Sequence, residues 1–476
     1  MADTEFDLIV IGSGPAGYVG AIRAAQLGMS VACVEKRKTL GGTCLNVGCI
    51  PSKALLHASE KYFETASGHL AELGIEVGNT KLNLSEMMSG KDKIVSGLTG
   101  GIEHLFKKNK ITRLIGAASL KGQGRVDVSA SGKIKSYSAS RILIATGSVP
   151  TSLPNVEIDE TRIVSSTGAL ALDKLPKSMV VIGAGYIGLE MGTVWSRLGT
   201  KVEVVEYLPR ILPGMDLEVA NKFKAIMTKQ GLSFHMNTAV KSAKATKTGV
   251  TLILADAKSH EETEMKCDIA LVSVGRRPNT EGLNLEDLGV AVNERGQIIV
   301  DENFETNIEG VFAVGDVIPG PMLAHKAEED SVAAVEIMAG QAGHVDYDLV
   351  PGIVYTAPEI ATLGATEEAL IEADIDYKKG LFPFLANSRA KATGHTDGFV
   401  KILADAKTDR VLGCHIIAHE AGTLIHEVAT AMAFGASSED IARTCHGHPT
   451  MNEAVKEAAL AVDGRAIHIW LPTPRI

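Results

Sequence analysis

One pattern occurs twice in this chain of 476 residues and constrains its fold more than any other feature. A short apolar strand runs into a glycine-rich turn and then into a stretch with helical periodicity, first from residue 6 and again from residue 179. In each copy a second strand leads to a carboxylate 23 residues after the first glycine, from Gly12 to Glu35 and from Gly183 to Glu206. Strand, turn and helix in this order form the βα unit of dinucleotide-binding folds. The repeat therefore predicts an α/β protein with two Rossmann-like dinucleotide-binding domains.

The glycines of each turn have separate physical roles. The first permits a tight turn, the second lets a pyrophosphate approach the backbone at the helix N-terminus, and the third lets helix and strand pack closely. These positions are Gly12, Gly14 and Gly17 in the first copy and Gly183, Gly185 and Gly188 in the second. One such turn also occurs in other α/β folds, whereas two copies with equal spacing favour two nucleotide sites.

The carboxylate of Glu206 bears on the choice of nucleotide. A carboxylate at that position binds the 2′-hydroxyl of a ribose and repels a 2′-phosphate. We therefore expect NAD rather than NADP at the second site, with the reservation that Arg210 lies close enough in sequence to turn inward.

Between the two units, residues 41–53 place Cys44 and Cys49 five positions apart, just before Pro51 and Ser52, which favour a helix start. Unpaired N–H groups and the macrodipole of a helix N-terminus stabilise a thiolate, so we expect a lowered pKa at Cys49. Two thiols this close can cycle between dithiol and disulfide. The alternatives are a stapling disulfide and a metal site. Metal-ligand pairs usually lie about two to four residues apart, and no second pair matches this one.

Composition and charge indicate which binding partners and which cellular compartment are compatible with this chain. The chain has 57 acidic and 47 basic residues and therefore a net charge of −10. This charge argues against nucleic acid as a partner. This acidity either serves solubility or offers a face to a basic partner domain. The other four cysteines are scattered, which indicates a reducing compartment. Because no signal peptide or membrane-spanning run is apparent, we expect a cytoplasmic bacterial protein, or one of the mitochondrial matrix if the chain is already processed.

Two further strands end in turns suited to a polyol. Residues 141–147 end in Ala145-Thr146-Gly147, and residues 310–316 end in Asp316. Each would deliver backbone groups or a carboxylate to a ligand, although each alone is also an ordinary core strand.

Exchange between a dithiol and a disulfide needs a base, since a free thiol is mostly protonated at neutral pH. Among 14 histidines, His448 is the candidate. Glu453 could hold one imidazole nitrogen and leave the other to take a proton. Residues 450–453 also predict a capping box that opens the next helix. His446 is the nearby alternative base.

The order of these features resembles the flavoprotein disulfide reductases over nearly the whole chain. Within that family, residues 41–53 and the segment His-Pro-Thr-Met-Asn-Glu at 448–453 are similar to the dihydrolipoyl dehydrogenases. The resemblance implies an FAD-binding domain at 1–150, an NAD-binding domain at 151–275, a central domain at 276–345 that completes the FAD site, and an α+β interface domain for dimerisation at 346–476.

The resemblance also implies roles for individual residues. Cys44, Cys49, Lys53, Glu190, His448 and Glu453 would be catalytic, with Lys53 beside the flavin and paired with Glu190. Asp316 would bind the ribityl chain, Gly116 would meet the adenine, and residues Met322, Leu323, Ala324 and His325 would pack over the flavin ring. The remaining FAD contacts would be Gly12, Gly14, Gly17, Glu35, Lys36, Gly42, Thr43, Cys44, Lys53, Ala145, Thr146 and Gly147. NAD would bind at Gly183, Gly185, Gly188, Glu190, Glu206, Val240 and Gly275.

In such a protein a dihydrolipoyl group is oxidised through a Cys44–Cys49 disulfide and FAD, and NAD+ is reduced to NADH. Cys44 would meet the substrate and Cys49 the flavin, while His448 would come from the other subunit of a homodimer. The expected partners are the lipoyl-bearing acyltransferase core of 2-oxo acid dehydrogenase complexes, through a basic subunit-binding domain, or the lipoyl protein of glycine cleavage.

Three other functions are weighed against this one. A glutathione-reductase-like enzyme would need basic residues where Glu206 stands. A mercuric reductase would need a cysteine pair near the C-terminus, and no cysteine follows Cys445. A structural subunit of a multienzyme complex would not need intact Cys44, Cys49 and His448. The apolar, proline-containing tail at 467–476 has no assigned role.

Overall fold

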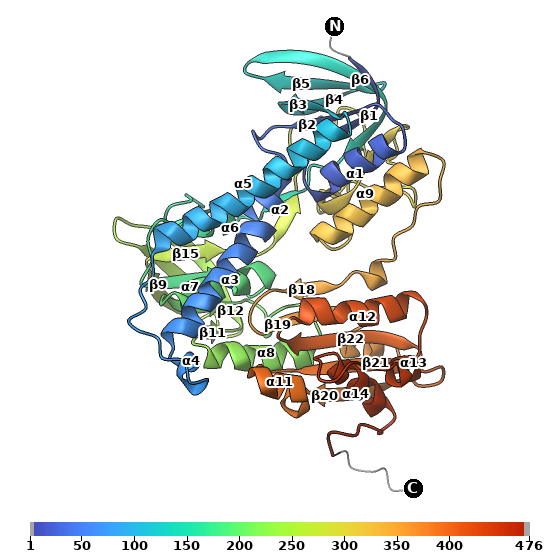
Figure 1. Cartoon of the computed structure of the whole chain (residues 1–476). Coiled ribbons are helices and arrows are strands. Elements are labelled where there is room, and N and C mark those ends of the chain that lie inside the picture. The colour runs from blue at the N-terminus through green and yellow to red at the C-terminus, as the bar shows by residue number, and fades with distance from the viewer. Residues whose placement is uncertain (1–3, 471–476) are drawn as a thin grey trace. The chain divides into compact units, whose positions relative to one another are not determined.

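The computed structural model describes residues 4–470 (Figure 1). Contacts within the chain group it into two compact units. The first unit contains residues 1–55, 83–151 and 275–347, and the second contains residues 56–82, 152–274 and 348–476. Residues 1–3 and 471–476, which include most of the tail singled out in the sequence, lie outside the described part. Between residues 4 and 470, no helix is both long and apolar enough to cross a membrane.

The first unit is built on a seven-stranded sheet in the order β3-β2-β1-β6-β5-β4, with β17 paired to β6. Its parallel part comprises β1 (Glu5–Ile11), β2 (Val31–Glu35), β3 (Thr112–Ile115), β6 (Lys133–Ile144) and β17 (Val311–Ala313), whereas β4 (Ala117–Gly122) and β5 (Arg125–Ala130) are antiparallel. β2 and β17 are wholly buried and β1 is buried from Leu8 to Ile11, as near-continuous apolar runs predict. The first predicted βα unit is confirmed.

Small residues allow the helices of this unit to pack closely. Helix α1 (Pro15–Gln26) lies against α9 (Ala324–Met338), and a side chain at Gly20 would collide with the Ser331 hydroxyl at 2.1 Å. That hydroxyl donates to the Ala16 carbonyl at 2.6 Å. The other helices are α2 (Gly42–Val47), α3 (Cys49–Ala66), which continues into the second unit, and α5 (Leu84–Lys108).

The second unit contains the other predicted nucleotide fold. A parallel sheet in the order β11-β10-β9-β15-β8 consists of β8 (Ile163–Val164), β9 (Ser178–Ile182), β10 (Lys201–Val205), β11 (Ser233–His235) and β15 (Ile269–Val272). Helices α7 (Tyr186–Arg197) and α8 (Leu217–Lys229) belong to this fold. An antiparallel meander of β12 (Thr238–Ala245), β13 (Val250–Asp256) and β14 (Glu262–Cys267) accompanies it. The second copy of the repeat is therefore confirmed as well.

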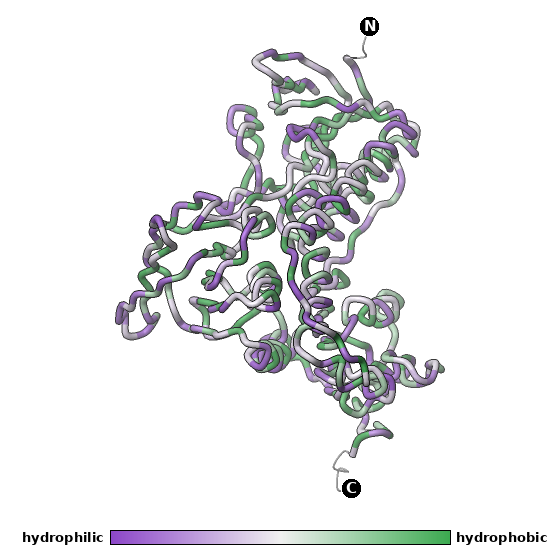
Figure 2. The backbone as a smooth tube through the Cα atoms, turned by 60° about the vertical axis from the view of Figure 1, so that its left-hand side comes forward, coloured by the Kyte–Doolittle hydropathy of each residue, from purple (hydrophilic) through white to green (hydrophobic). Residues whose placement is uncertain are grey.

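The C-terminal part of the second unit is α+β, as expected. Its antiparallel sheet has the order β18-β19-β22-β21-β20, from β18 (Gly352–Val354), β19 (Glu359–Gly364), β20 (Tyr377–Pro383), β21 (Phe399–Asp405) and β22 (Val411–Ala418). The helices of this part are α10 (Glu367–Glu372), α11 (Ser388–Thr393), α12 (Ala421–Ala433), α13 (Ser438–Arg443) and α14 (Glu453–Val462). Hydrophobic residues are spread along the whole chain, as several separate cores require (Figure 2). The predicted division into four domains stays a prediction.

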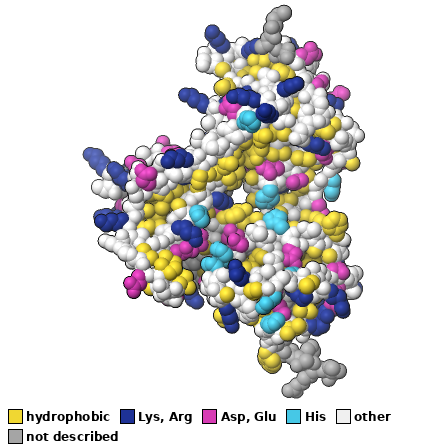
Figure 3. Space-filling view, in the orientation of Figure 1, with side chains coloured by type: hydrophobic (Ala, Val, Ile, Leu, Met, Phe, Trp, Pro, Cys, Tyr) yellow, Lys and Arg dark blue, Asp and Glu magenta, His cyan; other side chains and the backbone are white. Residues whose placement is uncertain are grey.

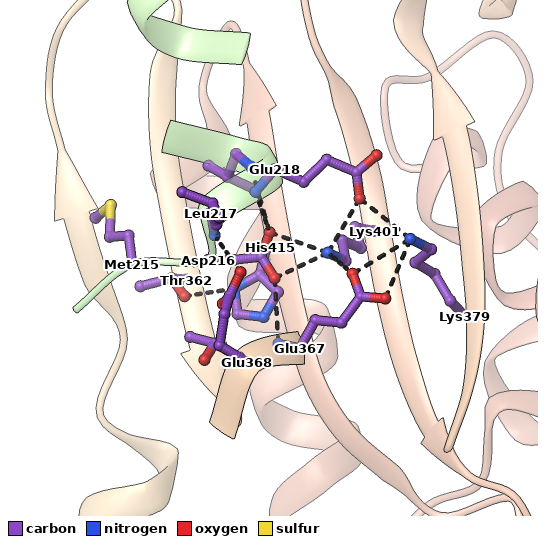
Figure 4. A network of polar contacts seen from close by, with 12 residues as sticks. Met215, Asp216, Leu217, Glu218, Thr362, Glu367, Glu368, Lys379, Lys401 and His415 are labelled. Atoms are coloured by element: carbon purple, nitrogen blue, oxygen red, sulfur yellow. Dashed lines mark hydrogen bonds and ion pairs between the residues drawn. The ribbon is translucent and has the colours of Figure 1, made fainter. Parts of the chain in front are cut away.

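A buried polar cluster ties α8 to the C-terminal sheet (Figure 4). The ammonium of Lys401 lies 2.8 Å from Asp216 Oδ2 and 2.5 Å from Glu367 Oε2, and neither the Lys401 nor the Asp216 side chain has exposed surface. Asp216 also accepts the Glu218 and Val219 amides and so caps α8. Burial alone would lower the pKa of Lys401, but its hydrogen bonds to Asp216 and Glu367 raise it, so the pair is charged.

Candidate functional site

The first glycine-rich turn is closed where helix and strand meet and open where a phosphate would lie. A side chain at Gly17 would sit 1.9 Å from the Gly12 carbonyl oxygen, so only glycine fits between α1 and the turn. At Gly14, by contrast, the nearest atom to an added Cβ is the Gly42 Cα at 3.9 Å. The backbone at Gly14 is thus uncrowded at the N-terminus of α1, which is what a pyrophosphate bound there would require.

The second turn repeats this geometry. A side chain at Gly188 would meet the Gly183 carbonyl oxygen at 2.2 Å, while a side chain at Gly185 would meet nothing within 4 Å. The two turns therefore share one closed and one uncrowded glycine position, the pattern that a dinucleotide-binding turn requires.

The two strand-end carboxylates are oriented toward their turns. Glu35 accepts the Ser13 hydroxyl at 2.6 Å and the Arg37 amide at 2.8 Å. Glu206 accepts the Ala184 and Leu208 amides, each at 2.8 Å. Both carboxylates thus lie beside the space where a ribose would bind.

Three further residues singled out in the sequence lie near these two carboxylates in the chain or in space. The Gly116 amide donates to the Glu35 carbonyl at 3.0 Å, which places Gly116 next to the predicted adenosine end, and Lys36 is exposed. The guanidinium of Arg210 donates to the Met215 carbonyl, within its own loop.

Three segments meet at Asp316, and two of their residues were not found from the sequence. The Asp316 carboxylate accepts the Ser148 hydroxyl at 2.5 Å, and Arg276 donates to the same hydroxyl at 2.7 Å. Burial lowers the pKa of Arg276, and the negative charges of Asp316 and Cys49 oppose this shift. Arg276 follows Gly275 directly, so the only available signal was its place after a predicted contact residue.

The strand end at 145–147 is held by Asn279, which lies three residues after Arg276. The Thr146 hydroxyl donates to the Asn279 carbonyl at 2.7 Å, and the Asn279 side chain returns a hydrogen bond at 3.1 Å. The predicted segment 322–325 leads into α9, with Leu323 as its N-cap and all four residues partly exposed.

The dithiol lies directly against the first glycine-rich turn. Cys44 is in α2, which the sequence did not predict, and Cys49 is the first residue of α3, two positions before the helix start predicted at Pro51 and Ser52. The Gly41 amide donates to the Ser13 carbonyl at 2.9 Å, and a side chain at Gly42 would lie 2.5 Å from the Gly14 Cα. This contact places Gly42 against the first glycine-rich turn and brings the cysteine segment to it.

The two sulfurs interact with each other. A hydrogen bond with Cys49 raises the pKa of Cys44, burial and the charge of Cys49 raise it further, and Lys53 opposes the shift. Ionisation of one sulfur therefore disfavours ionisation of the other. Such a pair holds one thiolate more readily than two.

His448 and Glu453 form the predicted pair. His448 Nδ1 lies 2.9 Å from Glu453 Oε1, and 69% of the His448 side chain is exposed. Within residues 4–470 no hydrogen bond engages Nε2 of His448. Although burial acts in the opposite direction, the Thr450 amide and His448 lower the pKa of Glu453, so its carboxylate is charged and orients the imidazole.

His446 does not have this freedom. Its Nε2 lies 2.5 Å from Glu427 and its Nδ1 lies 2.9 Å from the Thr444 carbonyl, and its side chain is 5% exposed. Both ring nitrogens are therefore engaged, which favours His448 as the base.

The predicted capping box at 450–453 is wrong in one half. The Glu453 carboxylate does accept the Thr450 amide at 2.9 Å. However, α14 begins at Glu453 with Asn452 as N-cap, and the Thr450 hydroxyl donates to the Gly447 carbonyl at 2.7 Å instead. The Thr450 hydroxyl therefore does not cap α14, because it is engaged by Gly447 in the turn that brings Glu453 to His448.

Of the remaining predicted residues, two belong to the second unit and two to the first. Glu190 is buried in α7 and accepts the Tyr355 amide at 3.1 Å, and Val240 lies in β12 against the apolar core of the nucleotide fold. Lys53 lies in α3 and belongs to the first unit. Gly275 also belongs to the first unit, where it begins the segment 275–347. The Lys53–Glu190 pair stays a prediction. On the face shown in Figure 3, basic and acidic side chains are intermingled without a continuous basic stripe.

Two family models match the chain. The first, described as pyridine nucleotide-disulphide oxidoreductase, matches residues 6–331, and the second, the dimerisation domain of these proteins, matches residues 350–459.

Individual relatives agree with these matches. The chain is 54% identical to the mitochondrial dihydrolipoyl dehydrogenase of Pisum sativum, over 98% of this chain and 93% of the relative. It is 52% identical to dihydrolipoyl dehydrogenase 3 of Pseudomonas putida, over 98% of this chain and 100% of the relative. Among solved structures it resembles LpdA from Mycobacterium tuberculosis, with a TM-score of 0.87 and 26% identity over 95% of this chain and 98% of that one.

Proposed function

Because the chain belongs to the pyridine nucleotide-disulphide oxidoreductase family, we propose that it oxidises dihydrolipoyl groups to lipoyl groups and reduces NAD+ to NADH. The observation that carries this function is the contact of the Cys44 and Cys49 segment with the first glycine-rich turn, where Gly42 approaches Gly14. FAD and NAD are its cofactors, and its dimerisation domain makes it a homodimer. Bound FAD supplies the two-electron carrier between the dithiol and NAD.

The residues of the first unit would hold and orient FAD. The open space at Gly14 would receive the pyrophosphate at the N-terminus of α1, and Glu35 would bind the adenosine ribose. Asp316, already fixed by the Ser148 hydroxyl, would bind the ribityl chain. Lys53 would stabilise negative charge beside the flavin.

The sulfur chemistry would begin with Cys44 and Cys49 joined as a disulfide. A substrate thiolate attacks the Cys44 sulfur, the Cys44–Cys49 bond breaks, and Cys49 leaves as a thiolate. The second substrate thiol then attacks the mixed disulfide, which releases the cyclic disulfide product and leaves Cys44 reduced. The substrate loses two electrons and the protein disulfide gains them.

His448 would take the proton of each attacking thiol. Its Nδ1 is held by Glu453, so its Nε2 is the nitrogen that can act as the base. The sequence-based expectation that this histidine serves the dithiol of the other subunit is part of the proposal.

Glu206 would select NAD, which gives a prediction with separate effects on KM and kcat. We expect Glu206→Ala to raise the KM for NAD+ about tenfold or more, because hydrogen bonds between a carboxylate and the ribose hydroxyls are lost, with little change in kcat. Steady-state kinetics at saturating dihydrolipoamide measure both. The matched control is Glu203→Gln on β10, the strand that leads to Glu206; the Glu203 carboxylate contacts Lys201 and His235. A KM within twofold of the parent value would remove Glu206 from the site.

Partner and compartment belong to the proposal. Lipoyl groups are carried on protein, so the partner would be the lipoyl-bearing acyltransferase core of a 2-oxo acid dehydrogenase complex, or the lipoyl protein of glycine cleavage. Relatives occur both in a bacterium and in mitochondria, so the compartment would be the bacterial cytoplasm or the mitochondrial matrix. Sedimentation of the protein with each purified partner separates the two assemblies.

A further inference from the structure

Helix α9 carries two fully buried charges one turn apart. The Lys326 ammonium lies 2.7 Å from Asp330 Oδ2, and neither side chain has exposed surface. Removing two charges from water is costly, and a buried ion pair of this kind is weak evidence of net stabilisation. The other contacts of Lys326 and Asp330 therefore have to be considered to explain why the ion pair is there.

Both members of the pair bind the same glycine. Asp330 Oδ2 accepts the Gly315 amide at 3.0 Å, and the Lys326 ammonium donates to the Gly315 carbonyl at 3.3 Å. Gly315 has a φ of +75°, and a side chain there would lie 3.0 Å from the Ala327 Cβ. The pair thus forms hydrogen bonds with both the amide and the carbonyl of Gly315, a residue whose backbone conformation favours glycine.

Tyr347 completes the network. Its hydroxyl donates to Asp330 Oδ1 at 2.9 Å, and the Lys326 ammonium lies 5.2 Å from the centre of its ring. The Asp330 carboxylate therefore has a partner on each oxygen, and Lys326 combines an ion pair with a cation–π contact. A fully partnered network of this kind is rigid.

The residue after Gly315 is Asp316, the predicted ligand of the ribityl chain. Asp316 lies in a short 3-10 helix at Gly315–Val317, where the Ser148 hydroxyl fixes its carboxylate. Lys326 and Asp330 of α9 hold the Gly315 backbone, and Ser148 holds the Asp316 side chain. The two neighbouring residues are therefore fixed from different parts of the chain. Together they fix where the carboxylate points.

We propose that Lys326 and Asp330 are positioning residues for FAD, which hold Gly315 so that Asp316 presents its carboxylate to the ribityl chain. This inference rests on the proposed function, because it takes the flavin to bind at Asp316. Neither Lys326 nor Asp330 touches the cofactor. Their effect on it passes through the Gly315 backbone.

The test replaces the pair by apolar residues of similar size in the holoprotein. Lys326→Met with Asp330→Leu removes both charges together, which buried ion pairs often tolerate. The rate of FAD release is followed by the gain of free-flavin fluorescence, and the visible circular dichroism of the bound flavin reports its placement. The matched control is Lys401→Met with Asp216→Leu, an equally buried pair whose contacts all lie in the second unit.

We expect FAD release to be at least about tenfold faster in the Lys326/Asp330 variant, with an altered visible dichroism, since two charged hydrogen bonds to the turn are lost. The control should release FAD within twofold of the parent rate. An unchanged release rate in the Lys326/Asp330 variant, or an equal acceleration in the control, would overturn the inference.

Two further variants keep the result interpretable. If the double variant does not fold, Tyr347→Phe removes a single oxygen from the network, and a release rate at least double that of the parent supports the role while an unchanged rate refutes it. Asp316→Ala separates the inference from the proposed function. Fast FAD release from Asp316→Ala alone would refute only the positioning role, whereas unchanged release from it would refute the flavin site itself.

Discussion

Serine at either Cys44 or Cys49 abolishes the oxidation of dihydrolipoamide, with an expected loss in kcat of at least about 10⁴-fold, as for other lost nucleophiles. A hydroxyl can neither form the disulfide nor leave as a thiolate, so no electrons can enter from the substrate. Transfer from NADH to an artificial acceptor such as ferricyanide does not need the dithiol and should persist. The two assays, run on the same preparation, measure the two halves of the reaction separately.

The two serine variants should also differ from each other. Cys44→Ser keeps the sulfur that is predicted to lie beside the flavin, so it should show long-wavelength absorbance without added reductant, whereas Cys49→Ser should not. Cys445→Ser is the control, because that thiol is exposed and has no place in the proposed chemistry. Normal lipoamide turnover in either Cys44→Ser or Cys49→Ser would show that the pair is not the redox centre.

Replacing His448 by glutamine should lower kcat for dihydrolipoamide about 10²- to 10⁴-fold, the usual contribution of a general base. Glutamine keeps hydrogen-bonding capacity but cannot take the thiol proton. Glu453→Gln should cost less, because it loosens the imidazole without removing the base. Raising the pH should partly restore the His448→Gln variant, since free thiolate then replaces the missing proton transfer.

His446→Gln is the matched control for this series, because both of its ring nitrogens are engaged in the protein. We expect it to retain lipoamide turnover within a few-fold of the parent. If His446→Gln lost as much activity as His448→Gln, the assignment of the base would fail.

A mixture of inactive subunits tests whether His448 acts across the dimer. In a hybrid of one Cys49→Ser subunit and one His448→Gln subunit, a base supplied by the other subunit leaves one complete active site. A base supplied within the same subunit leaves none. Recovery of about half of the activity per hybrid dimer is the predicted result, and an inactive hybrid or a fully active monomer would contradict it.

The sequence predicted those features that depend on short-range patterns. Local apolar periodicity and turn chemistry predict the strands before and after each glycine-rich turn, the two strand-end carboxylates and a helix start close to Cys49. The equal spacing of the two copies was informative because each unit folds from contiguous residues. The pairing of His448 with Glu453 was also predictable, since the two lie five residues apart.

Features that depend on distant segments could not be predicted in this way. Ser148, Arg276 and Asp316 come together from three parts of the chain, and no local pattern encodes their meeting. The same is true of Gly42 against Gly14. The capping box at 450–453 shows the reverse case, in which a valid local signal lost to the tertiary arrangement around His448.

The central claim is that electrons pass from an outside dithiol through Cys44 and Cys49 to FAD and then to NAD. Anaerobic titration of the holoprotein with dihydrolipoamide, followed by visible absorbance, tests it most directly. We expect a long-wavelength band from a thiolate next to the oxidised flavin, and formation of NADH when NAD+ is then added. If neither the band nor NADH appeared, electrons would not follow this route.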